Sequence, residues 1–561
     1  MNKVKTIKDD IRREVLAAVS RAVSEGRLPD IPAPAFTVDA PRDKNHGDFA
    51  VNIAMIMSKP AAMPPRAIAQ VIAGYMDPSP DWLDKVEIAG PGFLNFHLAS
   101  DYFHPILEAI LAEDRAYGRS DYGGGRRVQI EFVSANPTGL LHMGNARGAA
   151  LGDSLANVMS AAGFQVSKEY YINDAGNQIE NFGKSLEARY LELLGEEVEF
   201  PEDGYRGDDI TATARRILDR EGDRFLRADT ESRRGYMIGE GLREKLEDIR
   251  RSLEGFGVGF DVWFSELSLH EGGKIQETIS LLREKGLLYE KDGALWFRAT
   301  AFGDEKDEVM LRANGVPTYF ASDVAYHRDK FERGFETVIN IWGADHHGHV
   351  ARMKGAMGAF GYRPEDLEVV LMQLVRLMQG RETVRMSKRS GQYVTLDELV
   401  EEVGRDAARF FFVMRAAESQ MDFDLDLAKS QSSENPVYYV QYAHARIHSL
   451  LKMAQASRQE KAETRTGADL SLLAHPAERE LIRKLAELPE EVAQAAADRE
   501  PHRLPRYAMD LAALYHSFYT ECRCLVDDAA LRQARLQLCD ATRVVLRNVL
   551  EIIGVSAPER M

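Results

Sequence analysis

Hydrophobic residues recur in the N-terminal part of the chain with two different periods. In "IRREVLAAVSRAV" (residues 11–23) they follow the spacing of a helix, whereas "DKVEIAG" (84–90) and "FLNFHL" (93–98) have the short apolar runs of strands. Three successive glycines in "YGRSDYGGGRR" (117–127) then interrupt the pattern. We therefore expect residues 1–115 to form a separate N-terminal α+β domain.

The next pattern predicts a strand, a helix and a second strand. "RVQIEFVS" (127–134) and "FQVSKEYYI" (164–172) are the strands, and a helical period runs between them from about residue 142 to 162, after a break at Pro137. The same order recurs in residues 336–377. Two such units predict a protein of the α/β class with a doubly wound, Rossmann-like parallel sheet. Its ligands should lie beyond the carboxyl ends of the strands.

Two largely helical stretches complete the predicted organisation. Residues from about 175 to 290 are charged and helical in period, so we expect a helical insertion within a central domain that spans 116–395. From 396 to 561 the helical period is almost uninterrupted, which predicts an all-helical C-terminal domain. Thr395 and Glu398 have the spacing of a capping box at its start.

Composition excludes several classes of protein. A chain of 561 residues with 45% hydrophobic content can bury several cores. Its longest apolar runs, such as 410–414, are far shorter than the roughly 20 residues that cross a bilayer. The first residues mix acids with bases and lack an apolar segment, so we expect a cytoplasmic protein with no membrane association. The three cysteines all lie near the C-terminus and have no metal-ligand spacing.

The net charge of -17 argues against a protein coated with nucleic acid, but it leaves room for a local basic track. The densest run of cations, "RLMQGRETVRMSKR" (376–389), holds five Lys or Arg side chains and one acid. By charge alone, a solvated loop is the simpler interpretation of this segment.

The turn before the first predicted helix carries candidate chemistry. "HMGN" places His142, Gly144 and Asn145 where a helix N-terminus at the edge of a parallel sheet attracts phosphate. His142 and Asn145 can donate hydrogen bonds to charge that develops at phosphorus, and Gly144 leaves room for an adenosine against the backbone. The chain has neither a P-loop nor a GxGxxG fingerprint here. The alternative is a solvent-facing histidine that caps the helix.

A second motif, "RMSKRSG" (385–391), weighs against that alternative. A loop that carries Lys388 can place an ammonium against the departing pyrophosphate of ATP. Together the two motifs resemble the His-Ile-Gly-His and Lys-Met-Ser-Lys-Ser signatures of class I aminoacyl-tRNA synthetases, in the expected order. Asn145 replaces the last histidine, Arg385 the first lysine and Arg389 the final serine, and each replacement keeps a hydrogen-bond donor.

Within that class the chain is similar to the arginyl-tRNA synthetase family, of bacterial type, over nearly its whole length. The segments that carry the resemblance are "EFVSANPTGLLHMGN", "YYINDAGNQ", "RMSKR", "DAAR" and "NPVYYVQYAHAR". The N-terminal domain resembles that family's additional domain, which contacts the tRNA elbow. The C-terminal domain resembles its anticodon-binding domain, whose Asp-Ala-Leu-Arg signature stands here as Asp406, Ala407, Ala408 and Arg409.

The resemblance implies roles for individual residues, with 116–395 as the class I catalytic domain. The residues implied to be catalytic are His142, Asn145 and Lys388. Those implied to bind ATP are His142, Gly144, Asn145, Gly343, Met386, Ser387 and Lys388. Those implied to bind arginine are Glu131, Ser134, Asn136, Tyr319, Asp323 and Asp345. Those implied to contact tRNA are Arg385, Arg389, Tyr442 and Arg446.

The chemistry of arginine agrees with these implied positions. A guanidinium needs planar, paired acceptors, which carboxylates supply, and we expect Asp323 to be the principal one. Tyr319 offers a hydroxyl or an aromatic face. Without the resemblance, Glu131 could equally be a charge at a strand end and Asp323 a helix cap. Tyr442 and Arg446 share a helix face that suits core packing as well as contact with an anticodon base.

Asp345 and the histidines of "ADHHGH" allow two interpretations. They could be metal ligands, but their spacing matches no tight zinc signature. Their position at the turn after a strand favours contact with ATP or substrate instead. We therefore expect no protein-held metal, and we expect Mg²⁺ to arrive bound to ATP.

The implied reaction has two steps and uses L-arginine, ATP and tRNA(Arg). Arginine is first activated as arginyl-adenylate with release of pyrophosphate, and a terminal ribose hydroxyl of the tRNA then takes the arginyl group. The resemblance further implies that tRNA binds before activation, and we expect a monomer. A cysteinyl-type synthetase would need zinc-binding cysteines in the catalytic half, where none occurs. A non-catalytic paralogue would be expected to lose His142 or Lys388, and both are present.

Overall fold

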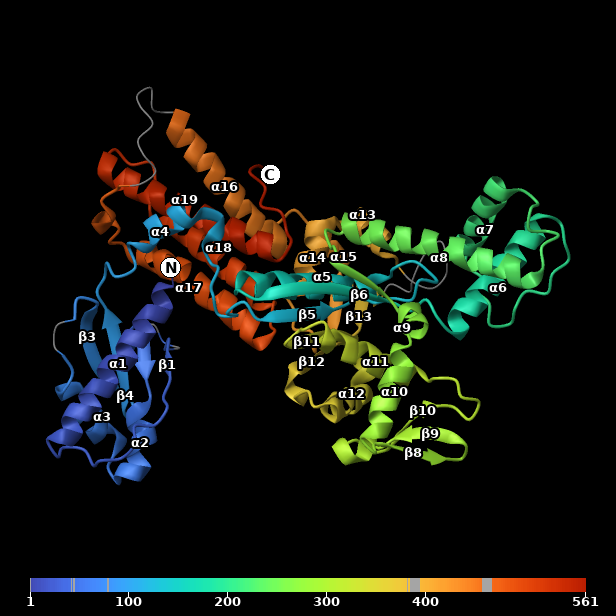
Figure 1. Ribbon diagram of the computed structural model, residues 1–561. Helices are drawn as coiled ribbons and strands as arrows, with labels where there is room; N and C mark the ends of the chain where they lie inside the picture. Colours follow the sequence, from blue (N-terminus) through green and yellow to red (C-terminus); the bar gives the residue numbers. More distant parts are fainter. Residues whose placement is uncertain are drawn as a thin grey trace.

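The computed structural model describes residues 2–41, 43, 46–77, 80–380, 382–383, 394–456 and 467–561. At its centre lies a parallel five-stranded sheet with the strand order β12-β11-β5-β6-β7 (Figure 1). The strands are β5 (Arg127–Glu131), β6 (Gln165–Ile172), β7 (Val262–Ser265), β11 (Thr337–Gly343) and β12 (Leu367–Met372). The strand order changes direction between β5 and β11, so the predicted doubly wound sheet is confirmed and its switch point lies between these two strands.

Helix α5 (Met143–Ala161) connects β5 to β6 and packs unusually closely because its sequence is rich in alanine and glycine. Gly152 lies against the aromatic ring of Phe132, and a Cβ atom on Gly152 would come within 2.1 Å of that ring. The helix is buried along most of its length. This packing fixes the N-terminus of α5 at the carboxyl edge of the sheet.

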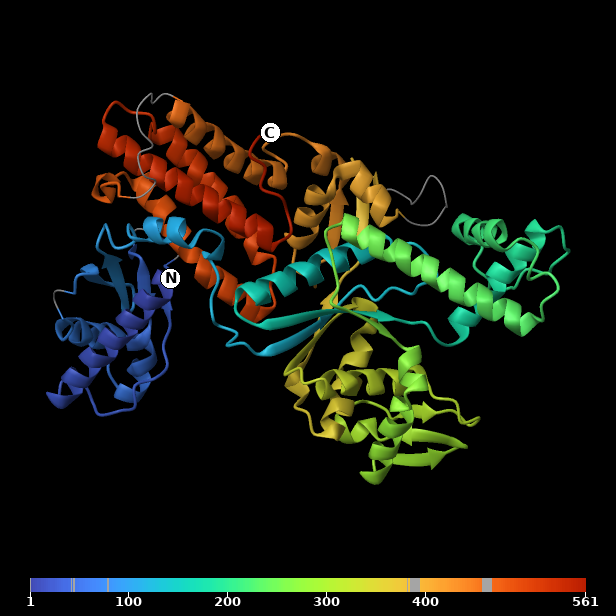
Figure 2. The same cartoon turned by 45° about the horizontal axis from the view of Figure 1, so that its top comes forward.

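The segment between β6 and β7 forms a helical lobe with its own small core. Its helices are α6 (Asn177–Leu193), α7 (Asp208–Glu221) and α8 (Thr230–Gly255), and the core includes Phe182, Leu186, Ile210 and Met237. The long helix α8 runs from this lobe back to the sheet (Figure 2). Strand β7 follows it and pairs with β6, so the stretch that we expected to be a helical insertion also contains the edge strand of the central sheet.

The segment between β7 and β11 forms a second, compact lobe on the other side of the sheet (Figure 1). Its strands β8 (Leu288–Lys291), β9 (Ala294–Phe297) and β10 (Glu308–Leu311) form an antiparallel sheet. Its helices are α9 (Leu267–Glu271), α10 (Lys274–Glu284) and α11 (Tyr319–Glu332), and α12 (His347–Phe360) packs beside them after β11. A separate core of aromatic and aliphatic side chains fills this lobe.

The N-terminal residues fold into a distinct α+β lobe (Figures 1 and 2). An antiparallel sheet of order β1-β2-β4-β3 packs with three helices. The elements are α1 (Lys3–Ser24), β1 (Val38–Asp39), β2 (Phe49–Val51), α2 (Ile53–Ala61), α3 (Pro65–Gly74), β3 (Leu83–Ala89) and β4 (Phe93–Leu98), and α4 (Ile106–Glu113) leads to the central sheet. Lys8 pairs with Glu490 of the C-terminal domain at 3.3 Å, and Tyr117 donates a hydrogen bond to the Leu485 carbonyl at 2.7 Å.

The C-terminal part is helical, as predicted, apart from one small sheet. Its helices are α13 (Leu396–Val403), α14 (Arg405–Val413), α15 (Leu425–Lys429), α16 (Pro436–Ala456), α17 (Pro476–Asp498), α18 (Arg503–Glu521) and α19 (Ala529–Ile552). The predicted capping box of Thr395 and Glu398 starts α13. The small sheet joins β13 (Val375–Gln379), β14 (Glu382–Thr383) and β15 (Met421–Asp424). No helix in the described ranges is long and apolar enough to cross a membrane.

A buried arginine joins the helical domain to the central sheet. Arg409 on α14 is fully buried, and its guanidinium donates to Asp153 of α5 at 2.6 Å and to the Ile553 carbonyl at 3.1 and 3.2 Å. Lys168 of β6 pairs with the second oxygen of Asp153 at 3.0 Å. A side chain at position 554 would collide with the guanidinium, which explains the glycine there. Such a buried charge is tolerated because every partner is in place.

Candidate active site

The candidate site lies at the carboxyl edge of the sheet, where β5 and β11 meet. Glu131 ends β5 and is paired in register with Asn340 of β11. The loop after β5 carries two consecutive residues with positive φ, Val133 (69°) and Ser134 (38°). Non-glycine residues adopt this backbone only where surrounding contacts hold it, and such strain clusters at functional sites.

The contacts of Ser134 show what holds the strained turn. Its hydroxyl donates to Glu131 at 2.9 Å and accepts the backbone N–H of Tyr171 at 3.1 Å. Glu131 is buried, and its other carboxylate oxygen accepts from the ammonium of Lys330 at 2.5 Å. Glu131 is therefore a buried, ion-paired carboxylate at the end of the strand, which fits the alternative of a strand-end charge, and its role toward arginine stays a prediction.

The N-terminus of α5 is closed by two reciprocal hydrogen bonds. The Nδ1 atom of His142 accepts the backbone N–H of Gly144 at 3.1 Å, and the Oδ1 atom of Asn145 accepts the backbone N–H of His142 at 3.0 Å. Because Nδ1 is the acceptor, a neutral His142 ring carries its hydrogen on Nε2. Protein atoms around the ring partly displace water and lower the pKa of His142, which favours the neutral form.

These bonds show that His142 and Asn145 cap the helix. The amide oxygen of Asn145 is used inside the protein, so its NH₂ group is the donor that it could offer a ligand. Gly144 is closely packed, because a Cβ atom there would come within 3.0 Å of the His142 ring. His142 is therefore an exposed capping residue, as the alternative interpretation has it, and its role toward phosphate stays a prediction.

Arg385, Met386, Ser387, Lys388 and Arg389 lie outside the described residues. The chain that follows them is described, and it lies against the His142 turn. Val394 accepts the backbone N–H of Met143 at 3.1 Å, and Leu396 donates to the Leu141 carbonyl at 2.9 Å. The described chain from residue 394 onward is therefore held directly beside the His142 turn.

A cluster of carboxylates faces the same edge of the sheet. Burial, followed by the negative charges of Glu266 and Glu131, raises the pKa of Asp323 to about 7. Burial also raises the pKa of Glu266, which is 4% exposed. The positive charge of Lys330 acts in the opposite direction and lowers the pKa of Asp323. Such a concentration of buried negative charge is costly in the free protein, and a cationic ligand would relieve it.

A cavity of about 560 Å³ opens beside this cluster. Its wall includes Glu266, Ser322, Tyr319 and Gly176, and Ile238 of the helical lobe closes one side. Tyr319 is half exposed at the first position of α11, with its hydroxyl next to Gly176. The lining combines the acids Asp174, Glu180 and Glu266 with His270, Arg312 and apolar side chains, and a cavity of this size fits a small polar metabolite.

Helix α11 places Asp323 in its interior. The N-cap of α11 is Thr318, whose hydroxyl accepts the backbone N–H of Ala321. The alternative that Asp323 is a helix cap is therefore wrong. One turn later, the backbone carbonyl of Asp323 accepts the Nδ1 hydrogen of His327 at 2.8 Å.

The remaining predicted residues lie further from the carboxylate cluster. Asn136 is exposed on the loop after β5. Gly343 ends β11 and Asp345 follows it, with an exposed side chain 3.7 Å from the ring of His346. In the part of the chain that the structure describes, no three or more His, Cys, Asp or Glu side chains are grouped as metal ligands.

Glu266 was missed by reasoning from the sequence. It directly follows β7, and its backbone N–H bonds to the Ile172 carbonyl at 3.0 Å. Because residues 175–290 were interpreted as a helical insertion, Glu266 was not recognised as a strand-end carboxylate like Glu131. The four-residue run "VWFS" before it was the available signal.

The proposed tRNA residues of α16 form an aromatic patch on the helical domain. The guanidinium carbon of Arg446 lies 4.1 Å from the centroid of the Tyr519 ring and 5.9 Å from that of Tyr442. Tyr442 is 42% exposed and stacks on Tyr438 with a centroid distance of 6.3 Å. A patch of stacked rings that remains open to solvent suits contact with an unpaired base.

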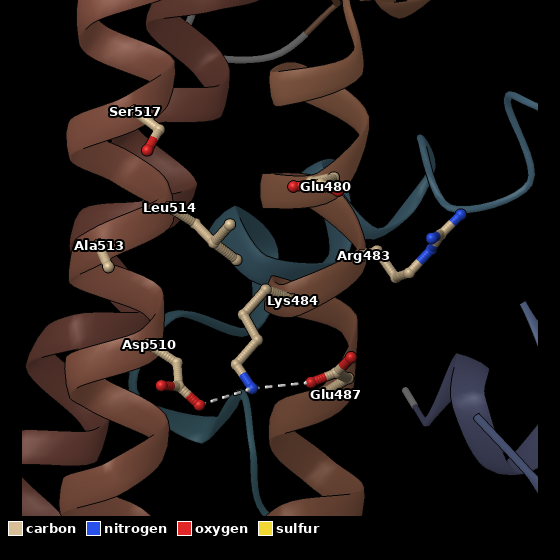
Figure 3. Close-up of a pocket in the computed structure, with 8 residues that line it drawn as sticks. All are labelled: Glu480, Arg483, Lys484, Glu487, Asp510, Ala513, Leu514 and Ser517. Carbon is tan, nitrogen blue, oxygen red and sulfur yellow. Dashed lines mark ion pairs between the residues drawn. The ribbon is translucent and has the colours of Figure 1, made fainter. Parts of the chain in front are cut away.

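A second groove, between α17 and α18, has a different character (Figure 3). Its volume is about 410 Å³ and it is lined mainly by charged side chains. Lys484 lies between Glu487 at 3.0 Å and Asp510 at 3.8 Å, so its ammonium is compensated within the groove (Figure 3). We therefore do not regard this groove as the active site.

The doubly wound sheet, the capped helix N-terminus at its switch point and the match of the central residues to a class I catalytic domain define a class I aminoacyl-tRNA synthetase. Three family profiles match the chain, namely "Arginyl tRNA synthetase N terminal domain" over residues 6–98, "tRNA synthetases class I (R), catalytic domain" over 106–431 and "DALR anticodon binding domain" over 440–561. The chain belongs to the arginyl-tRNA synthetase family.

Individual members of this family align with the chain over nearly its full length. A protein of Heliobacterium modesticaldum named arginine–tRNA ligase is 61% identical, covering 98% of this chain and 99% of its own. One of the same name from Moorella thermoacetica is 58% identical and covers 100% of both chains. The solved structure of Thermus thermophilus arginyl-tRNA synthetase has a TM-score of 0.74 at 26% identity, covering 98% of this chain and 100% of its own.

Proposed function

We propose that this synthetase attaches L-arginine to its cognate tRNA through an arginyl-adenylate formed at the carboxyl edge of the sheet. The observation that carries the proposal is the buried group of carboxylates beside the capped N-terminus of α5. Arginine is a cation and needs negatively charged acceptors, which the carboxylates supply. ATP is an anion and needs hydrogen-bond donors with partial positive charge, which the N-terminus of α5 supplies.

For arginine, Asp323 and Glu266 are the proposed acceptors of the guanidinium, because the charge of Glu266 acts on Asp323 and Glu266 lines the cavity. Tyr319 covers the cavity mouth with its ring or hydroxyl. The other residues proposed to bind arginine are Glu131, Ser134, Asn136 and Asp345. In this arrangement the cluster selects a planar cation that can pair with two carboxylates.

For ATP, bound as its magnesium complex, His142 Nε2 and the NH₂ group of Asn145 are the proposed donors to the α-phosphate. Gly144 and Gly343 leave room for the nucleoside. Met386, Ser387 and Lys388 are proposed to contact the phosphates, with the Lys388 ammonium against the departing pyrophosphate. The position of Val394, whose carbonyl accepts the backbone N–H of Met143, supports this role, because Val394 follows these residues in the chain.

The chemistry follows from this placement. A carboxylate oxygen of arginine attacks the α-phosphorus and the bond to pyrophosphate breaks. A terminal ribose hydroxyl of the tRNA then attacks the activated carbonyl, loses its proton and releases AMP. The protein supplies orientation and fixed donors and forms no covalent bond to the substrate.

For tRNA, we propose that Tyr442 and Arg446 meet an anticodon base, that Arg385 and Arg389 meet the acceptor end, and that the N-terminal lobe contacts the elbow. We further propose that the enzyme acts in the cytoplasm as a monomer and that tRNA binds before activation. The exposed aromatic patch on α16 supports the first of these assignments.

The decisive experiment is arginine-dependent pyrophosphate exchange, measured with and without tRNA, for the wild type and for Asp323→Asn and Glu266→Gln. Each substitution should raise the arginine KM at least tenfold, since it weakens a charge-assisted hydrogen bond of roughly 1.5–3 kcal/mol. The ATP KM should change less than about twofold in both variants.

Glu332→Gln is the matched control, because this carboxylate ends the same helix but pairs with Lys274 and Arg328. It should keep the wild-type arginine KM. If lysine supports exchange as well as arginine, or if both cluster variants keep the wild-type arginine KM, the proposed substrate site is wrong.

A further inference from the structure

Lys330 is a fully buried lysine whose ammonium lies at the carboxylate cluster of the candidate site. It lies on α11, two turns after Asp323, and its side chain has no exposed surface. Its ammonium donates to Glu131 at 2.5 Å and to the amide oxygen of Asn340 at 2.9 Å. The ammonium also lies 4.2 Å from the centroid of the Tyr326 ring.

These partners account for the whole ammonium. A buried lysine is costly unless its donors are satisfied, and here one carboxylate, one amide and one aromatic face do so. Glu131 lies at the end of β5 and Asn340 at the matching position of β11. Lys330 therefore holds together the two strands that border the switch point.

The same contacts lead from Lys330 to Asp323. Asn340 donates from its amide nitrogen to His327 Nε2 at 2.7 Å, and His327 donates from Nδ1 to the Asp323 carbonyl at 2.8 Å. Burial lowers the pKa of His327 to about 3, so this ring stays neutral and its two hydrogen bonds keep one direction. The orientation of Glu131 and the backbone of Asp323 are thus set by one network.

The titratable groups that face this region come from every element packed around it. They are Glu131 on β5, Glu169 and Tyr171 on β6, Glu266 after β7, His270 on α9, Asp323, Tyr326 and His327 on α11, and Arg333 after α11. Arg333 neutralises Glu169 with two bonds at 2.6 and 2.9 Å. Lys330 is then the cation that acts on Glu131 and Asp323, whereas His270 lies 3.7 Å from Glu266.

We propose that Lys330 is a positioning residue for arginine, which orients Glu131 and, through Asn340 and His327, the backbone at Asp323 before the guanidinium arrives. Lys330 acts as an internal cation at the back of the site, and it leaves a net negative charge for the substrate to neutralise. The inference rests on the arginine site proposed above, because its effect is exerted through Glu131 and Asp323.

The experiment compares Lys330→Met, Lys330→Arg and Glu131→Gln with the double variant Lys330→Met/Glu131→Gln. The readouts are arginine and ATP KM and the pH profile of kcat/KM for arginine. Lys274→Met is the control, because Lys274 pairs with Glu332 at 3.0 Å on the outer face of α11. Thermal unfolding reports whether each variant is folded.

Lys330→Met should raise the arginine KM at least tenfold and leave the ATP KM within about twofold, as expected for the loss of a charge-assisted contact. Its acid limb should move to higher pH, because the cation that favours ionised Asp323 is gone. Lys330→Arg should keep the wild-type limb. The double variant should cost no more than the larger single change, since the two residues act as one unit.

An unchanged arginine KM in Lys330→Met, or full additivity in the double variant, would overturn the positioning role. If Lys330→Met does not fold, Lys330→Arg carries the test, since it keeps the charge and alters the geometry. It should then raise the arginine KM with an unmoved acid limb, and a wild-type KM refutes the proposal. If Asp323→Asn and Glu131→Gln also leave arginine binding unchanged, the arginine site itself is misplaced.

Discussion

Arginine use by this enzyme should depend on pH in a range where ordinary carboxylates do not titrate. The pKa of Asp323 is raised to about 7, mainly by burial and then by Glu266 and Glu131. Arginine keeps its charge throughout this range, so the titrating partner is on the protein. Because a guanidinium binds to the ionised carboxylate, protonation of Asp323 removes the productive form of the free enzyme.

The magnitude follows from the ionised fraction. With a pKa of about 7, that fraction is roughly 0.9 at pH 8, 0.5 at pH 7 and 0.1 at pH 6, so kcat/KM for arginine should fall about tenfold from pH 8 to pH 6. A further tenfold loss is expected by about pH 5. The carboxylates interact, so this midpoint belongs to the group rather than to Asp323 alone.

The assay is initial-rate charging with arginine below its KM and with ATP and tRNA saturating, and ATP kcat/KM is measured in parallel. Glu266→Gln removes a negative neighbour of Asp323, so the acid limb for arginine should move to lower pH. A flat arginine profile between pH 6 and 8, or the same limb in Glu266→Gln, would refute the reasoning.

The same shift predicts an effect on stability. The folded-state pKa of Asp323 is raised, so its contribution to stability is present below its ordinary pKa and is lost as pH rises through about 7. Arginine binds the ionised form of Asp323, which is more populated at pH 8 than at pH 6. Arginine should therefore increase the Tm more at pH 8 than at pH 6. An equal increase at both values would contradict this sign.

Three further predictions concern other parts of the molecule. Lys388→Ala should lower the rate of adenylate formation at least about a hundredfold with little change in arginine KM, measured by pyrophosphate exchange. Asn145→Asp keeps the oxygen that caps His142 but loses the amide donor, so the Tm should stay near the wild type while activation slows; Asn145→Ala should also lose about 0.5–1.5 kcal/mol of stability in urea unfolding. Arg446→Ala should raise the tRNA KM about tenfold and leave arginine and ATP KM unchanged in charging assays, because Arg446 holds the exposed ring of Tyr442.

Local patterns were sufficient to predict the central sheet where strands and helices are long. The strand before Pro137, helix α5 and strand β6 were predicted because a period of 3.6 residues lies between two apolar runs. Strand β7 was not, because it has only four residues, a 26-residue charged helix precedes it and its pairing with β6 spans distant positions. The position of Glu266 at the site depends on that pairing, so it could not be predicted either.

The capping residues of α5 show a second limit of prediction from the sequence, which concerns the orientation of side chains. The residues of "HMGN" predict a helix N-terminus that faces phosphate, but the internal use of the Asn145 oxygen depends on side-chain orientation. Similarly, the sequence left open whether Asp323 caps a helix, and the position of Thr318 decides it. Lys330 has no sequence signal, because its burial arises from two strands and a helix packed together.

The contacts of Arg409 have a consequence for synthesis of the protein. Ile553 supplies a carbonyl to this buried guanidinium, and Gly554 provides the space for it. The ribosome makes these residues after every other part of the catalytic fold. A nascent chain interrupted before Ile553 retains a buried cation with part of its solvation missing, which is strongly destabilising. Prematurely terminated chains should therefore remain open to proteases, so that only nearly full-length molecules compete for tRNA in the cell.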